Sequence, residues 1–306
     1  MINRIVICCA LVLVTIFSVT CKNGQGGKKL TPVVFKITDI PAVITKPAAR
    51  AEYLAKHFWD GTNFEDSSII LIPDRLNAHY SSYIQHLYRC SESTARESLK
   101  NFIGSALNGN EGVRSYILSI VEASLYDPNS VIRNETAYIW VLESLTESSQ
   151  LDDLSKERYK SQLTLARKNR PGNKAYDFEY ITTNGKELAL SKTKGEYTLI
   201  MFYDPDCHAC TKAIEYLNSS EIIGKIGVKL KKIGVYTGED ITKWFQTAGK
   251  FPDGWTVAHD KERVISVNKL YDTRPSPSLY LLNKEKIVLL KDVSPQDLEL
   301  YFKSIQ

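Results

Sequence analysis

Two cysteines separated by two residues, Cys207 and Cys210, are the residues of this sequence most able to do chemistry. An apolar segment of strand-forming residues, 197–203, precedes them and residues with helical spacing follow, so Cys207 is predicted to lie at a helix N-terminus. Free N–H groups and the helix dipole favour negative charge there, which can lower a thiol pKa from ~8.5 to roughly 3.5–7.5. The thiolate is the form that attacks disulfides, and Cys210, one turn later, would resolve the mixed disulfide.

Other uses of such a pair have less support in the surrounding sequence. A structural zinc site would need two more ligands at a suitable spacing, and the chain contains no second C-x-x-C. Covalent haem attachment would need histidine directly after Cys210, where the chain has Thr211. Redox chemistry is therefore the favoured interpretation, and neither a metal nor a cofactor is expected.

Composition narrows the class of protein further. The chain has 306 residues and a net charge of only +4, with scattered basic residues, so no nucleic-acid-binding groove is expected. Hydrophobic residues make up 43% and charged residues 24%, which is typical of an ordinary folded core. At about 100–200 residues per domain, the length suggests one to two domains after any leader is removed.

The N-terminus is predicted to be a targeting segment. Arg4 precedes an apolar run, 5–17, which is shorter than the ~20 residues of a membrane span and fits the core of a signal peptide. Cys21 follows closely, where a bacterial lipoprotein signal places its lipidated cysteine. Residues 1–21 are therefore predicted to be a lipoprotein-type signal peptide that ends at the lipidated Cys21.

The residues after Cys21 agree with lipidation, because the stretch 22–31 is polar and glycine-rich, as a flexible tether should be. Two alternatives remain for the leader. One is a secretory signal cleaved nearby, which would leave an incidental cysteine, and the other is an uncleaved N-terminal membrane anchor. The favoured interpretation predicts a protein of the cell envelope, lipid-anchored to a membrane and facing the periplasm.

The remaining cysteines do not form a disulfide scaffold. Six are present, of which Cys8 and Cys9 lie in the leader and Cys21 would be lipidated. One close pair and one odd thiol are left, and in an oxidising compartment a lone C-x-x-C indicates redox machinery. The odd thiol, Cys90, is predicted to be a buried or half-buried structural thiol, with a regulatory role or pairing with Cys207 as the alternatives.

Hydrophobic periodicity divides the rest of the chain into two regions. Residues 32–170 are predicted to form an all-helical domain of unknown role, because apolar residues recur there with helical spacing. The expected helices cover residues 48–58, 80–88, 113–121, 137–145 and 151–166. The breaker sequence Arg170-Pro171-Gly172-Asn173 marks the boundary.

Strands and helices alternate from 173 to 306, which predicts an α/β domain that opens with a hairpin and closes with two strands and a helix. The expected strands are 178–181, 187–190, 197–203, 228–236, 278–282 and 286–291. A short extended piece is expected at 255–258. The expected helices are 207–223, 241–248, 263–270 and 295–305.

Residues 175–305 resemble the TlpA/ResA-like thioredoxin family, which implies a thioredoxin-like α/β/α domain there. Together with the helical pattern of residues 32–170, the predicted fold class is α + α/β: an all-helical N-terminal domain followed by a thioredoxin-like domain. The matching pieces are the turn Asn184-Gly185-Lys186, the strand ending in Phe202-Tyr203, the C-x-x-C and the segment 276–282. The whole chain also resembles a group of Gram-negative envelope lipoproteins that join a helical domain to a thioredoxin-like domain. That second resemblance implies no activity for the helical domain.

The family resemblance implies roles for individual residues. Pro277 matches a cis-proline that precedes the fourth strand of the family's fold and faces the two cysteines, with Pro275 as the competing candidate. Together with Ser276 it is expected to expose backbone groups that bind the substrate chain beside Cys207. The implied partners are envelope protein thiols or disulfides and an upstream membrane electron donor.

The chain also departs from the family's pattern. Asp206 and Ala209 stand where the family usually has Trp and Pro. Met201 stands where thioredoxins proper carry a buried acid, so proton transfer to and from Cys210 must use another group or water. His208, if protonated, would favour a thiolate and is expected to tune the site, with an exposed tip residue of small effect as the alternative.

These observations predict an envelope thiol–disulfide oxidoreductase that acts on protein substrates, in the reducing direction that the resemblance implies. A thiol peroxidase of a related branch is the enzymatic alternative, but it would typically have threonine three residues before its reactive cysteine, where this chain has Asp204. The non-enzymatic alternative is a tethered binding module in which the C-x-x-C only staples a loop.

Overall fold

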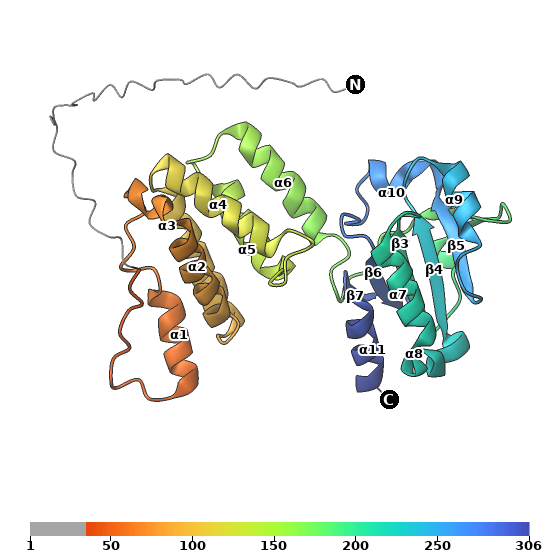
Figure 1. Cartoon of the computed structure of the whole chain (residues 1–306), viewed down its shortest axis with the longest axis horizontal. Coiled ribbons are helices and arrows are strands. Elements are labelled where there is room, and N and C mark those ends of the chain that lie inside the picture. The colour runs from red at the N-terminus through yellow and green to blue at the C-terminus, as the bar shows by residue number, and fades with distance from the viewer. Residues whose placement is uncertain (1–34, 306) are drawn as a thin grey trace, which may run out of the picture. The chain divides into compact units, whose positions relative to one another are not determined.

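From residue 35 to Arg167 the regular structure consists of helices, and strands alternate with helices from Glu179 onward, as the colour order of Figure 1 shows. This computed structural model describes residues 35–305. The predicted fold class is confirmed: a helical region precedes a thioredoxin-like domain. The predicted signal peptide, the lipidated Cys21 and the tether 22–31 lie outside the described residues.

The helical region contains all five predicted helices and one, α3, that was not predicted. Its elements are α1 (Pro47–His57), the 3₁₀ turn η1 (Ser67–Leu71), α2 (Pro73–Leu87), α3 (Glu92–Leu107), α4 (Glu111–Leu125), α5 (Glu135–Glu147) and α6 (Asp153–Arg167). The Ser91 side chain caps α3 by accepting a hydrogen bond from Thr94 N–H. That cap, and buried residues such as Leu99 and Phe102 at helical spacing, were signals by which α3 could have been predicted.

Aromatic packing holds this region together. Phe58 and Trp59, which follow α1, are buried, and the Trp59 ring stacks on Phe102 with ring centroids 4.5 Å apart. Tyr83 places its hydroxyl 2.8 Å from Ser98 Oγ, so a buried polar group has a hydrogen-bond partner.

In the part of the chain that the structure describes, no helix combines the length and apolar character needed to cross a membrane.

A seven-stranded sheet forms the centre of the C-terminal domain, in the order β2-β1-β5-β4-β3-β6-β7. The strands are β1 (Glu179–Thr182), β2 (Glu187–Ala189), β3 (Tyr197–Tyr203), β4 (Leu230–Tyr236), β5 (Trp255–Asp260), β6 (Ser278–Asn283) and β7 (Val288–Lys291). The segment predicted only as a short extended piece is therefore a full strand, β5. It pairs with β4 on one side and β1 on the other.

The helices of this domain are shorter than predicted at two places. They are α7 (His208–Ser219), α8 (Glu221–Ile226), α9 (Ile241–Ala248), α10 (Val264–Val267) and α11 (Pro295–Ser304). The helix predicted at 207–223 breaks at Ser220, whose side chain accepts from Ile223 N–H and starts α8. The helix predicted at 263–270 has only one turn, because Arg263 and Lys269 on either side of it adopt positive φ.

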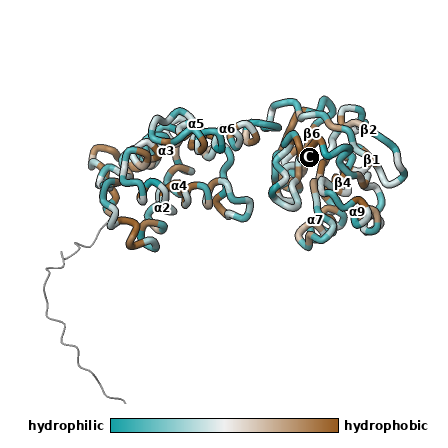
Figure 2. Tube along the Cα trace, turned by 90° about the horizontal axis from the view of Figure 1, so that it is seen from above, coloured by the Kyte–Doolittle hydropathy of each residue, from teal (hydrophilic) through white to brown (hydrophobic). Residues whose placement is uncertain are grey.

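Strand β3 is buried on both faces, which makes it a rigid support for the residues that follow it. Leu199 and Met201 pack with α7, α9 and α11 on one face, and Ile200 and Phe202 pack with α10 on the other. Figure 2 shows hydrophobic stretches among hydrophilic ones along the Cα trace of both regions. β3 and β6 are antiparallel with Phe202 opposite Ser278, so the loop after β3 and the loop before β6 meet at one end of the sheet.

Candidate active site

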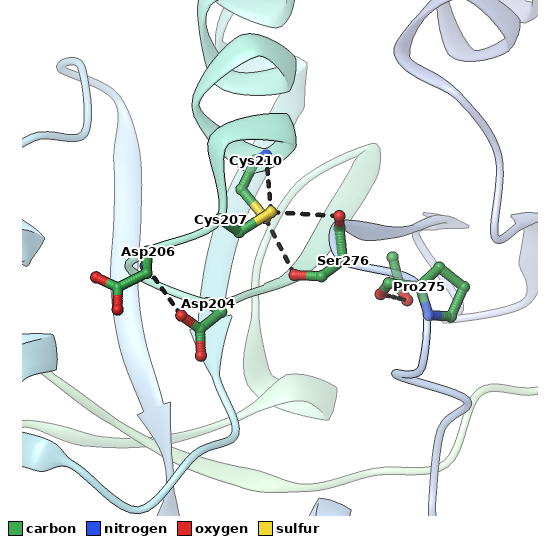
Figure 3. The surroundings of a disulfide bond; sticks show 7 residues. Asp204, Asp206, Cys207, Cys210, Pro275 and Ser276 are labelled. Atoms are coloured by element: carbon green, nitrogen blue, oxygen red, sulfur yellow. Dashed lines mark hydrogen bonds between the residues drawn. A yellow bond between two sulfur atoms is a disulfide. The ribbon is translucent and has the colours of Figure 1, made fainter. Parts of the chain in front are cut away.

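Cys207 and Cys210 are joined by a disulfide at the start of α7 (Figure 3). Cys207 is the N-cap residue of this helix, with an extended backbone, and its Sγ accepts a hydrogen bond from Cys210 N–H at 3.0 Å. An N–H group that points at Sγ stabilises negative charge on that sulfur once the disulfide is opened. The predicted position of Cys207 at a helix N-terminus is therefore confirmed.

The two cysteines differ in accessibility, as their positions on the helix require. Cys210 points into the core and is 2% exposed, whereas Cys207 is half-buried. A thiolate from another molecule can therefore approach Cys207 but not Cys210. This arrangement suits Cys207 for the intermolecular step and Cys210 for the intramolecular one.

The segment before β6 borders the disulfide. The Ser276–Pro277 peptide bond is cis, as expected, and Pro275 is not the cis-proline. The Ser276 carbonyl oxygen lies 3.2 Å from Cys207 Sγ, and the Ser276 hydroxyl lies 3.2 Å from Cys210 Sγ. Because a disulfide sulfur carries no hydrogen, the hydroxyl is the donor to Cys210 in this oxidised state.

This contact supplies a partner for Cys210 that the sequence did not reveal. Met201 is fully buried in the core beside the site, so no carboxylate occupies the position where thioredoxins proper have one. The Ser276 hydroxyl is instead the polar group next to Cys210 Sγ. From the sequence, Ser276 was expected only to bind the substrate chain.

The acidic residues before Cys207 are held in a defined arrangement. Asp204 accepts a hydrogen bond from Asp206 N–H at 2.9 Å, which closes the turn between β3 and α7. The Asp206 carboxylate pairs with Lys243 Nζ from α9, and this hydrogen bond raises the pKa of Lys243. The positive charge of Lys243 offsets the negative charge of Asp206, which would otherwise disfavour a Cys207 thiolate. No local sequence pattern indicated that Lys243 would lie there.

The other candidate residues are placed as follows. His208 lies exposed in the first turn of α7. Cys90 is a free, half-buried thiol whose Sγ lies 3.3 Å from Ala51 O and 3.2 Å from His86 O. Burial raises the pKa of Cys90 to about 11, so this thiol is protonated and unreactive near neutral pH.

A cavity of about 140 Å³ borders Cys210. Its wall is mostly apolar, and Tyr203, Ile214 and Phe251 contribute to it. Within residues 35–305, no group of three or more His, Cys, Asp and Glu side chains is placed to hold a metal ion.

Two family models match the chain. Residues 17–169, half of the chain, match Domain of unknown function (DUF5106). Residues 171–291 match the AhpC/TSA family. A crystal structure of a thioredoxin-like protein from Bacteroides caccae is 37% identical, with a TM-score of 0.85, and the match covers 90% of this chain and 100% of that chain.

Two curated relatives share the name Thiol-disulfide oxidoreductase ResA. The protein from Bacillus subtilis (strain 168) is 29% identical over 115 residues, which are 37% of this chain and 62% of the relative. The protein from Geobacillus kaustophilus (strain HTA426) is 27% identical over 139 residues, 44% of this chain and 78% of the relative. The chain thus spans less than two thirds of the length of the Bacillus subtilis relative.

Proposed function

Because this chain belongs to the thioredoxin-like proteins, with an AhpC/TSA-family domain after a DUF5106 domain, we propose that it exchanges dithiol and disulfide with protein substrates through Cys207 and Cys210. The observation that carries this proposal is the asymmetric pair at the start of α7, where a half-buried Cys207 caps the helix and a buried Cys210 lies behind it. A disulfide that only stabilised a loop or filled the core would not need one sulfur that is accessible to other molecules and lies at a helix N-terminus.

The reaction follows from this geometry. In the reduced protein, the Cys207 thiolate attacks one sulfur of a substrate disulfide, and the other substrate sulfur leaves as a thiolate. The Cys210 thiolate then attacks Cys207 Sγ, which releases the second substrate thiolate and forms the Cys207–Cys210 disulfide. Two electrons pass from the protein to the substrate, and an upstream dithiol donor at the membrane returns them by the reverse sequence.

The surroundings of the disulfide support a protein substrate. The backbone of Ser276 borders Cys207, and Pro277 has no N–H group to compete for hydrogen bonds there, so an extended chain can pair with this edge. His208 is exposed beside Cys207 and, when protonated, would favour the thiolate. Substrate binding is thus assigned to Ser276 and Pro277, and tuning to His208.

A comparison of two oxidants tests the proposal. The reduced protein is mixed either with insulin, a protein with accessible disulfides, or with hydrogen peroxide, and the loss of the Cys207 thiol is followed. We expect insulin to be reduced catalytically in the presence of a dithiol donor, and peroxide to react no faster than it does with a free thiol. Rapid peroxide consumption without insulin reduction would favour the peroxidase, and no reaction with either would favour a structural C-x-x-C. Cys90→Ser is the matched control and should behave as wild type.

We also propose that the protein acts in the cell envelope, facing the periplasm, with a lipid on Cys21. The support is the order of an apolar run, a cysteine and a polar stretch, 22–31, at the N-terminus. Expressed in a Gram-negative host, the wild type should sediment with membranes and incorporate labelled palmitate. Cys21→Ser should lose the label, while Cys90→Ser should keep it. A wild type that is processed, unlabelled and fully released from membranes would contradict the anchor.

A further inference from the structure

The segment that carries Ser276 to the disulfide is anchored at Asp272 and Arg274. Asp272 is 3% exposed and its carboxylate accepts hydrogen bonds from both Nε and Nη2 of Arg274, the first at 2.8 Å. The Asp272 carbonyl accepts from the Tyr280 hydroxyl at 3.1 Å, which ties the segment to β6. Only Pro275 separates Arg274 from Ser276, so the position of this ion pair constrains where Ser276 lies.

The helical region supplies the rest of the anchor. Residues 35–305 belong to one compact unit. The Arg274 guanidinium lies over the ring of Tyr126, with Cζ 3.5 Å from the ring centroid, and Tyr126 in turn stacks on Tyr138 from α5. Arg133, just before α5, approaches Asp272 with Nη2 at 3.7 Å and pairs through Nη1 with Asp292 after β7. Tyr126 and Arg133 both belong to the stretch between α4 and α5.

The charges in this cluster are matched: the Asp272 side chain is buried, those of Arg133 and Asp292 are mostly buried, and that of Arg274 is partly open to solvent. Burial alone would raise the pKa of Asp272, but the hydrogen bonds and positive charge of Arg274 outweigh it and lower that pKa. For Asp292, burial is the larger effect and raises the pKa despite Arg133. Asp272 is therefore the firmly ionised anchor, and its charge is compensated by one arginine from each region. A pair of this kind holds its geometry strongly, because separating it would leave a buried charge unpaired.

We propose that the helical domain is a positioning element of the active site: Tyr126 and Arg133 hold the Asp272–Arg274 pair, and this pair holds Ser276 against the two sulfur atoms. The inference rests on the proposed function and adds a role for the helical domain. The Ser276 hydroxyl stabilises a Cys210 thiolate more than it stabilises the same sulfur in the disulfide, because hydrogen bonds to charged groups are stronger. Correct placement of Ser276 therefore favours the reduced protein, and loosening of the anchor shifts the equilibrium towards the disulfide.

The test measures the equilibrium of the Cys207–Cys210 pair with a dithiothreitol redox buffer, in the full chain and without any protein substrate. Tyr126→Leu keeps apolar volume against Tyr138 but removes the ring face beneath Arg274. We expect it to shift the equilibrium constant about three- to tenfold towards the oxidised form, where tenfold corresponds to about 30 mV for two electrons. Tyr126→Phe keeps the ring and should match the wild type. Arg133→Lys, which is too short to reach both carboxylates, is an independent second variant with the same expected direction.

Two controls decide whether the effect passes through Ser276. Glu135→Gln weakens the Glu135–Lys291 ion pair, 2.8 Å, which joins the same two regions without touching the segment 272–276. It should lower the thermal midpoint while leaving the redox equilibrium unchanged. Tyr126→Leu combined with Ser276→Ala should shift the equilibrium no further than Ser276→Ala alone.

An unchanged equilibrium in both Tyr126→Leu and Arg133→Lys would overturn the inference. So would an additive double variant, or a Glu135→Gln shift as large as that of Tyr126→Leu. The redox equilibrium is measured without a protein substrate. Failure of the insulin reaction would therefore count against the proposed function but would not change the result of this equilibrium measurement.

Discussion

Replacement of Cys207 by serine is expected to abolish disulfide exchange, with a fall in rate on the order of 10³-fold or more, since the nucleophile itself is removed. Cys210 cannot take over the first step, because it is 2% exposed and lies behind Cys207. The rate of insulin reduction with a dithiol donor gives the measurement. A variant that keeps a substantial fraction of the wild-type rate would show that another thiol carries the reaction.

The partner variant, Cys210→Ser, should fail at a different step. It keeps the half-buried Cys207 at the helix cap, so it should still attack a substrate disulfide, but it cannot resolve the product. A covalent complex with the substrate should accumulate and be visible on a non-reducing gel and by mass spectrometry. Accumulation in Cys207→Ser instead would reverse the two roles. Cys90→Ser should turn over at the wild-type rate, since that thiol is protonated near neutral pH.

Ser276→Ala is expected to slow exchange by about tenfold to a hundredfold. The Ser276 hydroxyl is 3.2 Å from Cys210 Sγ, and a hydrogen bond to a charged group contributes roughly 1.5–3 kcal/mol. That stabilisation is needed whenever Cys210 leaves as a thiolate, which happens each time the disulfide is opened at Cys207. With Met201 in the core beside the site, no buried carboxylate can compensate at that position.

The substitution separates two possible roles of this residue. The Ser276 carbonyl, which borders Cys207, is unchanged in Ser276→Ala, so substrate docking should persist: kcat falls while KM stays near its wild-type value. Ser276→Thr retains the hydroxyl and should recover most of the rate. A higher KM with an unchanged kcat would instead mean that the Ser276 side chain acts only in binding the substrate chain.

Local sequence patterns were sufficient for the parts of this protein that depend on neighbouring residues. Strand-forming residues before Cys207 and helical spacing after it placed the cysteine at the N-terminus of α7. The hairpin of β1 and β2 followed from its Asn184-Gly185 turn, and the helices from their apolar stripes. The cis bond at Pro277 was expected from the family resemblance and not from any local pattern.

The contacts between residues that are distant in the sequence were decided by the tertiary structure alone. Asp206 and Lys243 pair across 37 positions, the Ser276 hydroxyl reaches Cys210 across 66, and Arg274 lies on Tyr126 from the helical region. β5 could be recognised as a full strand only once β1 and β4 were on either side of it. The physical reason is that such contacts depend on strand order and register, such as Phe202 opposite Ser278, and on side-chain packing, and none of these is carried by the spacing of residues along one segment.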